Sequence, residues 1–124
     1  FLTYARAAWE RGSNYSFSLR LKTTNRLIGS IGVVHDEGKI QFGYILSPQQ
    51  WGMGYATEAC RTVLTVIRSL PDIYRISTFV DVENRASVRV LQKAGLVQEA
   101  RLEKWFRFVN QGGQPKDCLL FKIP

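Results

Sequence analysis

The sequence has no apolar run that approaches the roughly 20 residues of a membrane-spanning helix, and no signal peptide is visible. It has only two cysteines, Cys60 and Cys118, and their spacing fits neither a metal-ligand pair nor a redox motif. We therefore expect two reduced thiols in the core of a cytoplasmic protein, no bound metal and no membrane partner.

The chain also has no basic tract, although basic residues outnumber acidic ones. Its 17 Lys and Arg against 10 Asp and Glu give a net charge of +7 and a pI near 9.8, yet no two basic residues are adjacent. Scattered charge is typical of a solvated surface and argues against a nucleic-acid-binding tail. It still attracts small polyanions, such as a phosphate-rich cofactor.

The 124 residues fit one domain, 1–124, because no repeat, low-complexity tract or linker divides them. Hydrophobic periodicity predicts a mixed α/β (α+β) sheet with flanking helices. The expected helices are Phe1–Arg11, Tyr55–Leu70 and Arg85–Ala94. The expected strands are Tyr15–Leu21, Leu27–Val34, Ile40–Leu46, Tyr74–Val82, Gln98–Val109 and Asp117–Ile123, with the turn "NQGGQ" between the last two.

Two glycines, Gly52 and Gly54, stand between an expected strand and the expected helix from Tyr55. Glycine adds backbone entropy to the unfolded chain, which costs about 0.5–1 kcal/mol relative to alanine. It also allows an anion to approach the first-turn N–H groups of a helix, where the helix dipole is positive. A plain tight turn is the alternative to a phosphate site.

Two nucleotide-binding motifs are excluded at this loop. A Walker-type loop needs a lysine after its second glycine, and none is present. The dinucleotide pattern G-x-G-x-x-G fails because Thr57 stands where the third glycine belongs.

The spacing Gln49-x-x-Gly52-x-Gly54 resembles the Q/R-x-x-G-x-G/A loop of the GNAT acetyltransferases. The segments "IGSIGVV", "IQFGYILSPQQWGMGYATEA" and "NRASVRVLQKAGLVQEARL" are similar to the RimJ/RimL-like branch, the ribosomal-protein-alanine N-acetyltransferases. The resemblance implies a GNAT fold, whose sheet is splayed between two central parallel strands. It further implies that an N-terminal strand and helix are missing before Phe1, so that the domain is truncated.

The resemblance implies acetyl-CoA as co-substrate and no metal. Backbone groups of the third expected strand should pair with the pantetheine arm, and those of the loop should bind the pyrophosphate. The cofactor-binding residues expected in this way are Ile45, Leu46, Gln50, Trp51, Gly52, Met53, Gly54, Tyr55, Ala56, Thr57, Asn84 and Ser87.

The resemblance assigns catalysis to Ser87, as the proton donor to the departing thiolate. Many GNAT enzymes use a tyrosine seven residues after the asparagine, but that position here is Leu91. Asn84 and Ser87 also suit a helix start, so capping and cofactor contact both remain open. No general base is assigned: Gln41 replaces the usual carboxylate, while Glu103 and Phe106 lie at or near the branch's base position.

Three other reactive residues have structural interpretations that we prefer. Cys60 lies on the apolar face of its expected helix, so a packed thiol is favoured over an acetyl-cysteine intermediate. Glu58 suits the positive end of the helix dipole. His35 adjoins the Asp36–Lys39 turn and is expected at the surface, and Trp51 is expected to act as a lid or packing residue.

The predicted function is transfer of an acetyl group from acetyl-CoA directly to a primary amine, on a small molecule or a protein N-terminus, with a homodimer possible. A module that binds coenzyme A without transferase activity is the alternative. A third hypothesis, nucleic-acid binding through Arg101–Arg107, lacks a fold signature. The positive net charge disfavours polycationic acceptors.

Overall fold

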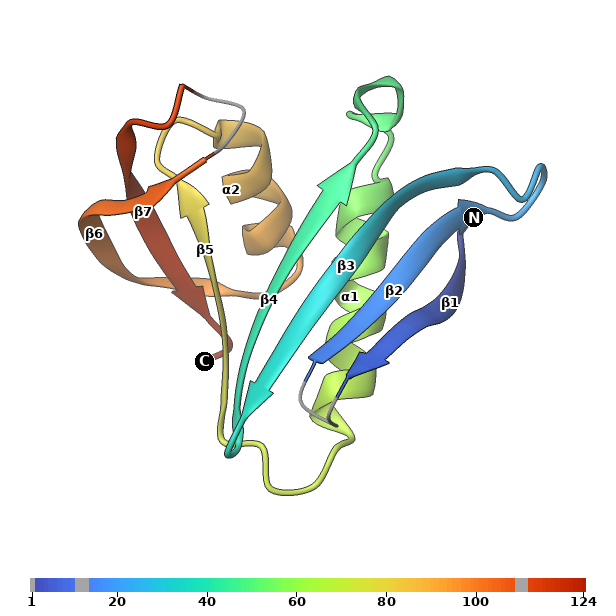
Figure 1. The fold of residues 1–124 in the computed structure, drawn as a ribbon, viewed down its shortest axis with the longest axis horizontal. Coiled ribbons are helices and arrows are strands. Elements are labelled where there is room, and N and C mark those ends of the chain that lie inside the picture. Colours follow the sequence, from blue (N-terminus) through green and yellow to red (C-terminus); the bar gives the residue numbers. More distant parts are fainter. Residues whose placement is uncertain (1, 11–13, 109–111) are drawn as a thin grey trace.

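The computed structural model describes residues 2–10, 14–108 and 112–124 (Figure 1). In chain order its elements are β1 (Leu2–Glu10), β2 (Asn14–Leu21), β3 (Leu27–Asp36), β4 (Lys39–Leu46), the 3-10 turn η1 (Pro48–Gln50), α1 (Tyr55–Arg68), β5 (Arg75–Asp81), α2 (Arg85–Lys93), β6 (Val97–Arg107) and β7 (Pro115–Lys122). Part of the expected "NQGGQ" turn lies outside the described residues.

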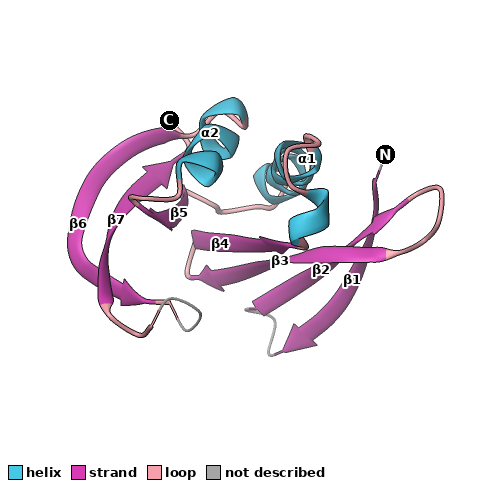
Figure 2. Ribbon diagram, turned by 90° about the horizontal axis from the view of Figure 1, so that it is seen from above, coloured by secondary structure: helices cyan, strands magenta, loops and turns pink. Residues whose placement is uncertain are grey.

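The described strands form one sheet in the order β1-β2-β3-β4-β5-β7-β6. Neighbouring strands are antiparallel except for β4 and β5, which are parallel and are joined through α1. Both helices lie on the same face of the sheet, and β6 and β7 curl away from that face (Figure 2). The prediction of a mixed, mostly antiparallel sheet with a central parallel pair is confirmed.

The segment before residue 11 forms a strand, so the prediction of a helix over Phe1–Arg11 was wrong. Leu2–Glu10 pairs with β2 along its whole length, from Leu2 opposite Leu21 to Glu10 opposite Asn14. The alanines and arginines of this segment favour a helix locally. Pairing with a neighbouring strand satisfies the same backbone groups, and this tertiary contact outweighs a weak local propensity.

The core lies between the sheet and α1 because both elements are apolar on one side. Along β4, Ile40, Phe42 and Leu46 are buried while Gln41, Gly43 and Ile45 are exposed. The buried side chains of α1 recur at helical spacing and meet them: Ala59, Cys60, Val63, Leu64 and Ile67. Each buried aliphatic side chain contributes about 1.5–3 kcal/mol, and this contact fixes the start of α1 beside the end of β4.

Side-chain and glycine caps define both ends of α2. The Asn84 side chain accepts a hydrogen bond from the Ser87 backbone N–H at 3.2 Å, which caps the first turn. At the other end Gly95 has φ +97°, and Leu96 N–H donates to the Leu91 carbonyl at 3.0 Å in a Schellman motif. The Asn84 cap was expected from the sequence. In the described part of the chain, no helix is long and apolar enough to cross a membrane.

The parallel pair β4–β5 separates after three residue pairs, the last of which is Gln41 with Ser77. Figure 1 shows the two strands together at their N-terminal ends and apart at their C-terminal ends. At the point of separation the buried Thr78 hydroxyl donates to the Phe42 carbonyl at 2.6 Å. The expected splay between the two central strands is therefore present. Where the backbone hydrogen bonds between them end, the Thr78 side chain supplies the hydrogen bond to β4.

We predict that Thr78→Val lowers the free energy of unfolding by about 1–2 kcal/mol, because the buried Phe42 carbonyl loses its donor without a change in side-chain shape. Chemical denaturation measures the difference. Thr65→Val is the matched control, since Thr65 donates to a helix carbonyl at an exposed position. An equal effect of the two substitutions would contradict the role given to Thr78.

Candidate functional site

The loop between β4 and α1 has two glycines in backbone conformations that other residues rarely adopt. Gly52 has φ +77° and Gly54 has φ +81°. A Cβ atom added at either position would meet nothing within 4 Å, so the space above both glycines is open. Before them the chain forms a tight turn, in which Gln50 N–H donates to Ser47 and Trp51 N–H donates to Pro48. The loop N–H groups outside that turn therefore begin at Gly52.

The N-terminus of α1 has no side-chain cap. Gly54 occupies the N-cap position, and the first intrahelical bond runs from Glu58 N–H to the Gly54 carbonyl at 3.0 Å. The N–H groups of Tyr55, Ala56 and Thr57 precede that bond and have no helical acceptor. Together with the helix dipole, they form a positive site open to an anion.

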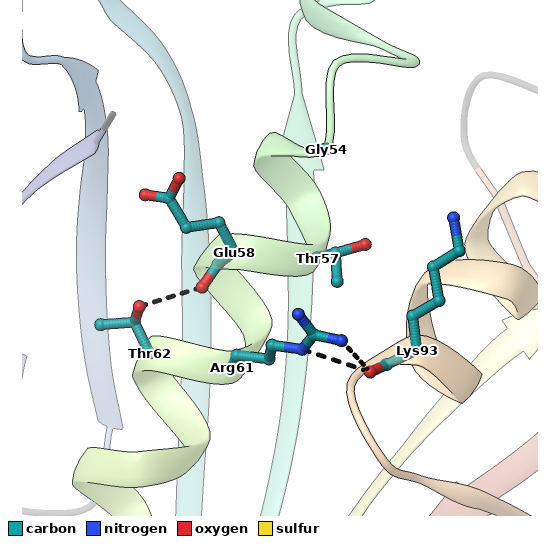
Figure 3. Close-up of a pocket in the computed structure, with 6 residues that line it drawn as sticks. All are labelled: Gly54, Thr57, Glu58, Arg61, Thr62 and Lys93. Atoms are coloured by element: carbon teal, nitrogen blue, oxygen red, sulfur yellow. Dashed lines mark hydrogen bonds between the residues drawn. The ribbon is translucent and has the colours of Figure 1, made fainter.

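A hollow of about 370 Å³ lies next to this helix start (Figure 3). Its lining residues come from α1 and from the end of α2: Gly54, Thr57, Glu58, Arg61, Thr62 and Lys93. Thr57, Arg61 and Lys93 extend into the space between the two helices. The Arg61 guanidinium donates to the Lys93 carbonyl at 2.8 and 3.2 Å, which ties α1 to α2 and leaves the Lys93 ammonium directed toward the loop end of the hollow.

Backbone groups of β4 alternate between the two neighbouring strands. Ser47 N–H donates to Ile28 at 2.7 Å, and pairs along an antiparallel ladder alternate in bonding, so the backbone of Ile45 faces β3. The backbone groups of Tyr44 and Leu46 face the opposite side, where β5 has separated. We expected both Ile45 and Leu46 to offer backbone groups to the pantetheine arm. The backbone of Leu46 does face the opening, whereas the backbone of Ile45 faces β3, so the prediction was wrong for Ile45.

Trp51 closes part of this opening. Its indole Nε1–H donates to the Leu46 carbonyl at 2.9 Å, while the side chain stays 65% exposed. The ring thus satisfies one of the carbonyls that β5 no longer reaches. The Leu46 N–H and both backbone groups of Tyr44 lie along the remaining opening.

A hydrogen bond on the helix side of the opening joins β4 to α2. The Tyr44 hydroxyl donates to the Ser87 Oγ at 2.9 Å. Burial raises the pKa of Tyr44, and the bond to Ser87 and the nearby Cys60 modify it less, so this phenol is protonated at neutral pH. Since Ser87 Oγ accepts from Tyr44, its own O–H is available to donate. The Leu91 side chain is 2% exposed and belongs to the core.

Among the described residues, none that we considered as a general base, or that stands at a base position of the family, is hydrogen-bonded to Tyr44 or to the Ser87 hydroxyl. Gln41 and Glu103 are exposed, and Phe106 packs against Phe79 with ring centroids 5.0 Å apart. His35 is half-buried, not fully at the surface as expected, and its Nε2 accepts from Gly38 N–H at 3.1 Å in the adjacent turn. Glu58 occupies the first turn of α1, as expected.

Comparison with known proteins identifies the family. Residues 1–97 match the domain family described as "Acetyltransferase (GNAT) domain". This chain belongs to that family. It is 28% identical over 120 residues to the uncharacterized N-acetyltransferase YoaA of Bacillus subtilis, covering 94% of this chain and 66% of YoaA. It is 27% identical over 93 residues to spermidine N(1)-acetyltransferase of Escherichia coli K12, covering 75% of this chain and 48% of that protein.

Solved structures show the same fold. A spermidine N-acetyltransferase SpeG chimera from Vibrio cholerae and hSSAT superposes with a TM-score of 0.79 at 23% identity, covering 91% of this chain and 68% of that one. The SpeG F149A mutant from Vibrio cholerae gives a TM-score of 0.78 at 21% identity, covering 91% and 66%. The chain spans between about half and two thirds of the length of the curated relatives it matches.

Like Arg61 and Lys93 of the hollow, Tyr44 is a residue of the site that the sequence did not indicate. It stands in "FGYIL", inside the segment similar to the family, but its partner Ser87 is 43 positions away. No local pattern connects them. The Asn84–Ser87 spacing and the alternation of β4 were the only available signals, because they place both residues on the helix face of the sheet.

Both cysteines of this GNAT domain are buried free thiols. Cys60 is 0% exposed and burial raises its pKa to about 12, while Cys118 is buried and its pKa is also raised, chiefly by burial. The thiolate is the reactive form, so the predicted packed-thiol role of Cys60 fits its environment. Within the described residues, no group of three or more His, Cys, Asp or Glu could hold a metal ion.

We predict that a thiol reagent at pH 8 labels the native chain at least about 100-fold more slowly than the unfolded chain, because the Cys60 thiolate forms only near pH 12 in the native state. Raising the pH from 9 toward 12 should also lower stability, since the unfolded thiol ionises first. Rapid labelling of native Cys60, located by mass spectrometry, would restore a covalent mechanism.

Proposed function

We propose that this GNAT domain transfers the acetyl group of acetyl-CoA directly to a primary amine. The observation that carries the proposal is the uncapped start of α1 behind Gly52 and Gly54, set beside the opening between β4 and β5. A pyrophosphate requires N–H donors and bare backbone, and this loop offers both. Family membership and relatives named as N-acetyltransferases support the same activity.

The residues of the chain fit acetyl-CoA along one continuous path. The N–H groups from Gly52 to Thr57 bind the pyrophosphate, while Gln50 contributes only its place in the turn. Lys93 and the Thr57 hydroxyl line the adjacent hollow, and they bind the phosphate on the ribose of coenzyme A, which is separate from the pyrophosphate. The Leu46 N–H and the backbone of Tyr44 pair with the pantetheine arm. Met53 and Trp51, both more than half exposed, cover the bound molecule.

Ser87 supplies the proton to the thiolate that leaves. The Tyr44 hydroxyl donates to Ser87 Oγ, so the Ser87 O–H is directed away from the Tyr44 ring. A hydroxyl that accepts a hydrogen bond becomes a somewhat better donor, because successive bonds polarise one another. Asn84 binds the Ser87 backbone N–H and thereby sets the position of the first turn.

We place the domain in the RimJ/RimL-like branch. The combination of Asn84, Ser87 and Leu91 supports this, because the catalytic tyrosine position of other GNAT enzymes is a buried leucine here. The acceptor is then a small-molecule amine or a protein N-terminus. A cytoplasmic location and a possible homodimer stay predictions of the resemblance.

A module that binds coenzyme A without transferring acetyl groups is the second candidate. Gln41 and Phe106, which carry no titratable group, stand where the family places a base. Acetyl transfer under this alternative should be absent with every amine, although acetyl-CoA still binds. Following free thiol release from acetyl-CoA with a panel of amines separates the two functions.

We predict that Gly54→Ala lowers acetyl-CoA affinity at least about 10-fold, because the new Cβ enters the space above the loop and strains a backbone with φ +81°. Calorimetry measures the affinity. Gly112→Ala is the control, since Gly112 has φ +76° and equally open surroundings, but lies in the β6–β7 turn. Both variants should lose about 1 kcal/mol of stability, and equal affinities would remove the loop from the site.

We predict that Ser87→Ala lowers turnover roughly 10- to 1,000-fold with a much smaller change in acetyl-CoA affinity, as expected when a proton donor is removed. The Asn84 cap is kept, because it uses the Ser87 backbone. Ser69→Ala is the control, since its hydroxyl bonds only a helix-end carbonyl.

Tyr44→Phe tests whether the phenol acts through Ser87. Turnover should fall about 3- to 10-fold in the single variant and not fall further when the substitution is added to Ser87→Ala, which is the signature of coupled residues. Additive losses would separate Tyr44 from the proton path. Full activity of Ser87→Ala would exclude Ser87 as the proton donor.

A further inference from the structure

A cluster of aromatic rings lies on the sheet face opposite the helices. Phe79 of β5 packs against Trp105 and Phe106 of β6, with ring centroids 6.3 and 5.0 Å apart, and Phe106 packs against Phe108 at 4.9 Å. Trp105 is 51% exposed and Phe106 is 44% exposed. We call Phe79, Trp105, Phe106 and Phe108 the aromatic cluster. It is an exposed apolar surface that neither the core nor the cofactor path uses.

An irregularity in β6 brings these rings together. Leu102 pairs with Cys118 and Phe106 pairs with Lys116, so β6 holds two more residues than β7 between these points. Lys104, at the centre of this bulge, has φ +46°, which is strained for a residue with a side chain. Bulges of this kind redirect side chains and occur near functional sites. Here the bulge places Trp105 and Phe106 against Phe79.

The aromatic cluster adjoins the opening between β4 and β5. Thr78, at the point where the strands separate, immediately precedes Phe79. Val80 belongs to the core on the helix side, so alternation along β5 places Phe79 on the opposite face. Ile45, 75% exposed between Tyr44 and buried Leu46, shares that face. The helix side holds the Tyr44–Ser87 bond, and the aromatic cluster therefore faces the other side of the same opening.

The charges around the cluster do not suit a polycation. Most carboxylates of β5, β6 and β7 and of the turn after β5 are held in ion pairs: Glu99 with Arg75 and Lys122, Asp117 with Arg101, and both Asp81 and Glu83 with Lys116. Glu103, exposed in the bulge, makes no ion pair with any described residue. A single unpaired carboxylate offers little negative charge to the several positive charges of a polyamine.

We infer that the acceptor of this domain is a monoamine of low pKa that carries an aromatic or similarly large apolar group, which is bound by the aromatic cluster, and that polyamines are poor acceptors. The inference rests on the proposed transferase function and names its substrate class. Phe106 at the base position supports the inference, because a phenylalanine cannot remove a proton from the amine and the amine must already be partly neutral. An α-amine, with a pKa of about 7.7–8.0, is partly neutral at pH 7 without a base, unlike a lysine-type amine near 10.4.

The chemistry of the transfer requires that neutral form. The amine nitrogen bonds to the acetyl carbon while the carbon–sulfur bond breaks, and the nitrogen gives up one proton to water. The sulfur receives one proton from Ser87, and Ser87 regains a proton from water. The aromatic cluster acts by positioning the side group of the amine, so it should affect KM and the choice of acceptor more than the proton transfer itself.

The test compares three amines with the same protein: phenylalanine amide, glycine amide and spermidine. We expect kcat/KM for phenylalanine amide to exceed that of each of the others at least about 10-fold, the scale of discrimination that one apolar group provides. Trp105→Ala should reduce the preference for phenylalanine amide over glycine amide at least about 5-fold, whereas Trp105→Phe should retain most of it.

Glycine amide controls for damage to the fold, because Trp105→Ala should change its kcat/KM less than about 3-fold if the ring only positions an aromatic group. Val66→Ala, at an exposed position on α1, is the matched surface control. If acetyl-CoA binds and spermidine or glycine amide is the best acceptor, the inference is overturned. If acetyl-CoA does not bind, or if it binds while no amine of the panel is acetylated, the proposed transferase function itself fails.

Discussion

Every feature of the site depends on the separation of β4 from β5. Two central strands that part expose backbone groups in the middle of a sheet, and buried groups without partners cost about 1–3 kcal/mol each. The Thr78 hydroxyl satisfies the Phe42 carbonyl and the Trp51 indole satisfies the Leu46 carbonyl, at 2.6 and 2.9 Å. These two side chains keep the opening from closing into a continuous ladder, and they leave the groups of Tyr44 and the Leu46 N–H for a ligand.

The separation also explains why the two helices sit where they do. α1 connects the diverging strands and begins at the C-terminal end of β4, so its uncapped N-terminus faces the opening. α2 follows β5 and is tied to α1 by Arg61, which donates to the Lys93 carbonyl. The proposed phosphate site, the proposed path of the pantetheine arm and the proposed proton donor thus all follow from the separation of these two strands.

The sequence predicted the parts of this arrangement that local backbone chemistry determines. Gly52, Gly54 and the Asn84 cap depend on conformations that few residue types adopt. It failed for Leu2–Glu10, whose strand depends on pairing with β2, and for the backbone direction of Ile45, which depends on register. The bond between Tyr44 and Ser87 could not be predicted from the sequence, because it joins distant segments. The bulge at Lys104 could not be predicted either, because it places a lysine at a φ that lysine rarely adopts.

The two faces of the opening differ in composition: backbone groups dominate one face and side chains the other, and this difference bears on specificity. On the helix face, the groups that we propose to bind acetyl-CoA are mainly backbone N–H groups in a loop with two glycines, so many substitutions elsewhere leave them in place. On the opposite face the surface consists of side chains, set by a bulge that a few changes in β6 would remove. Structures at 21–23% identity share this fold, and changes confined to the side chains of β6 would leave that fold in place. The aromatic cluster is the part of this chain in which a difference in the accepted amine would be encoded.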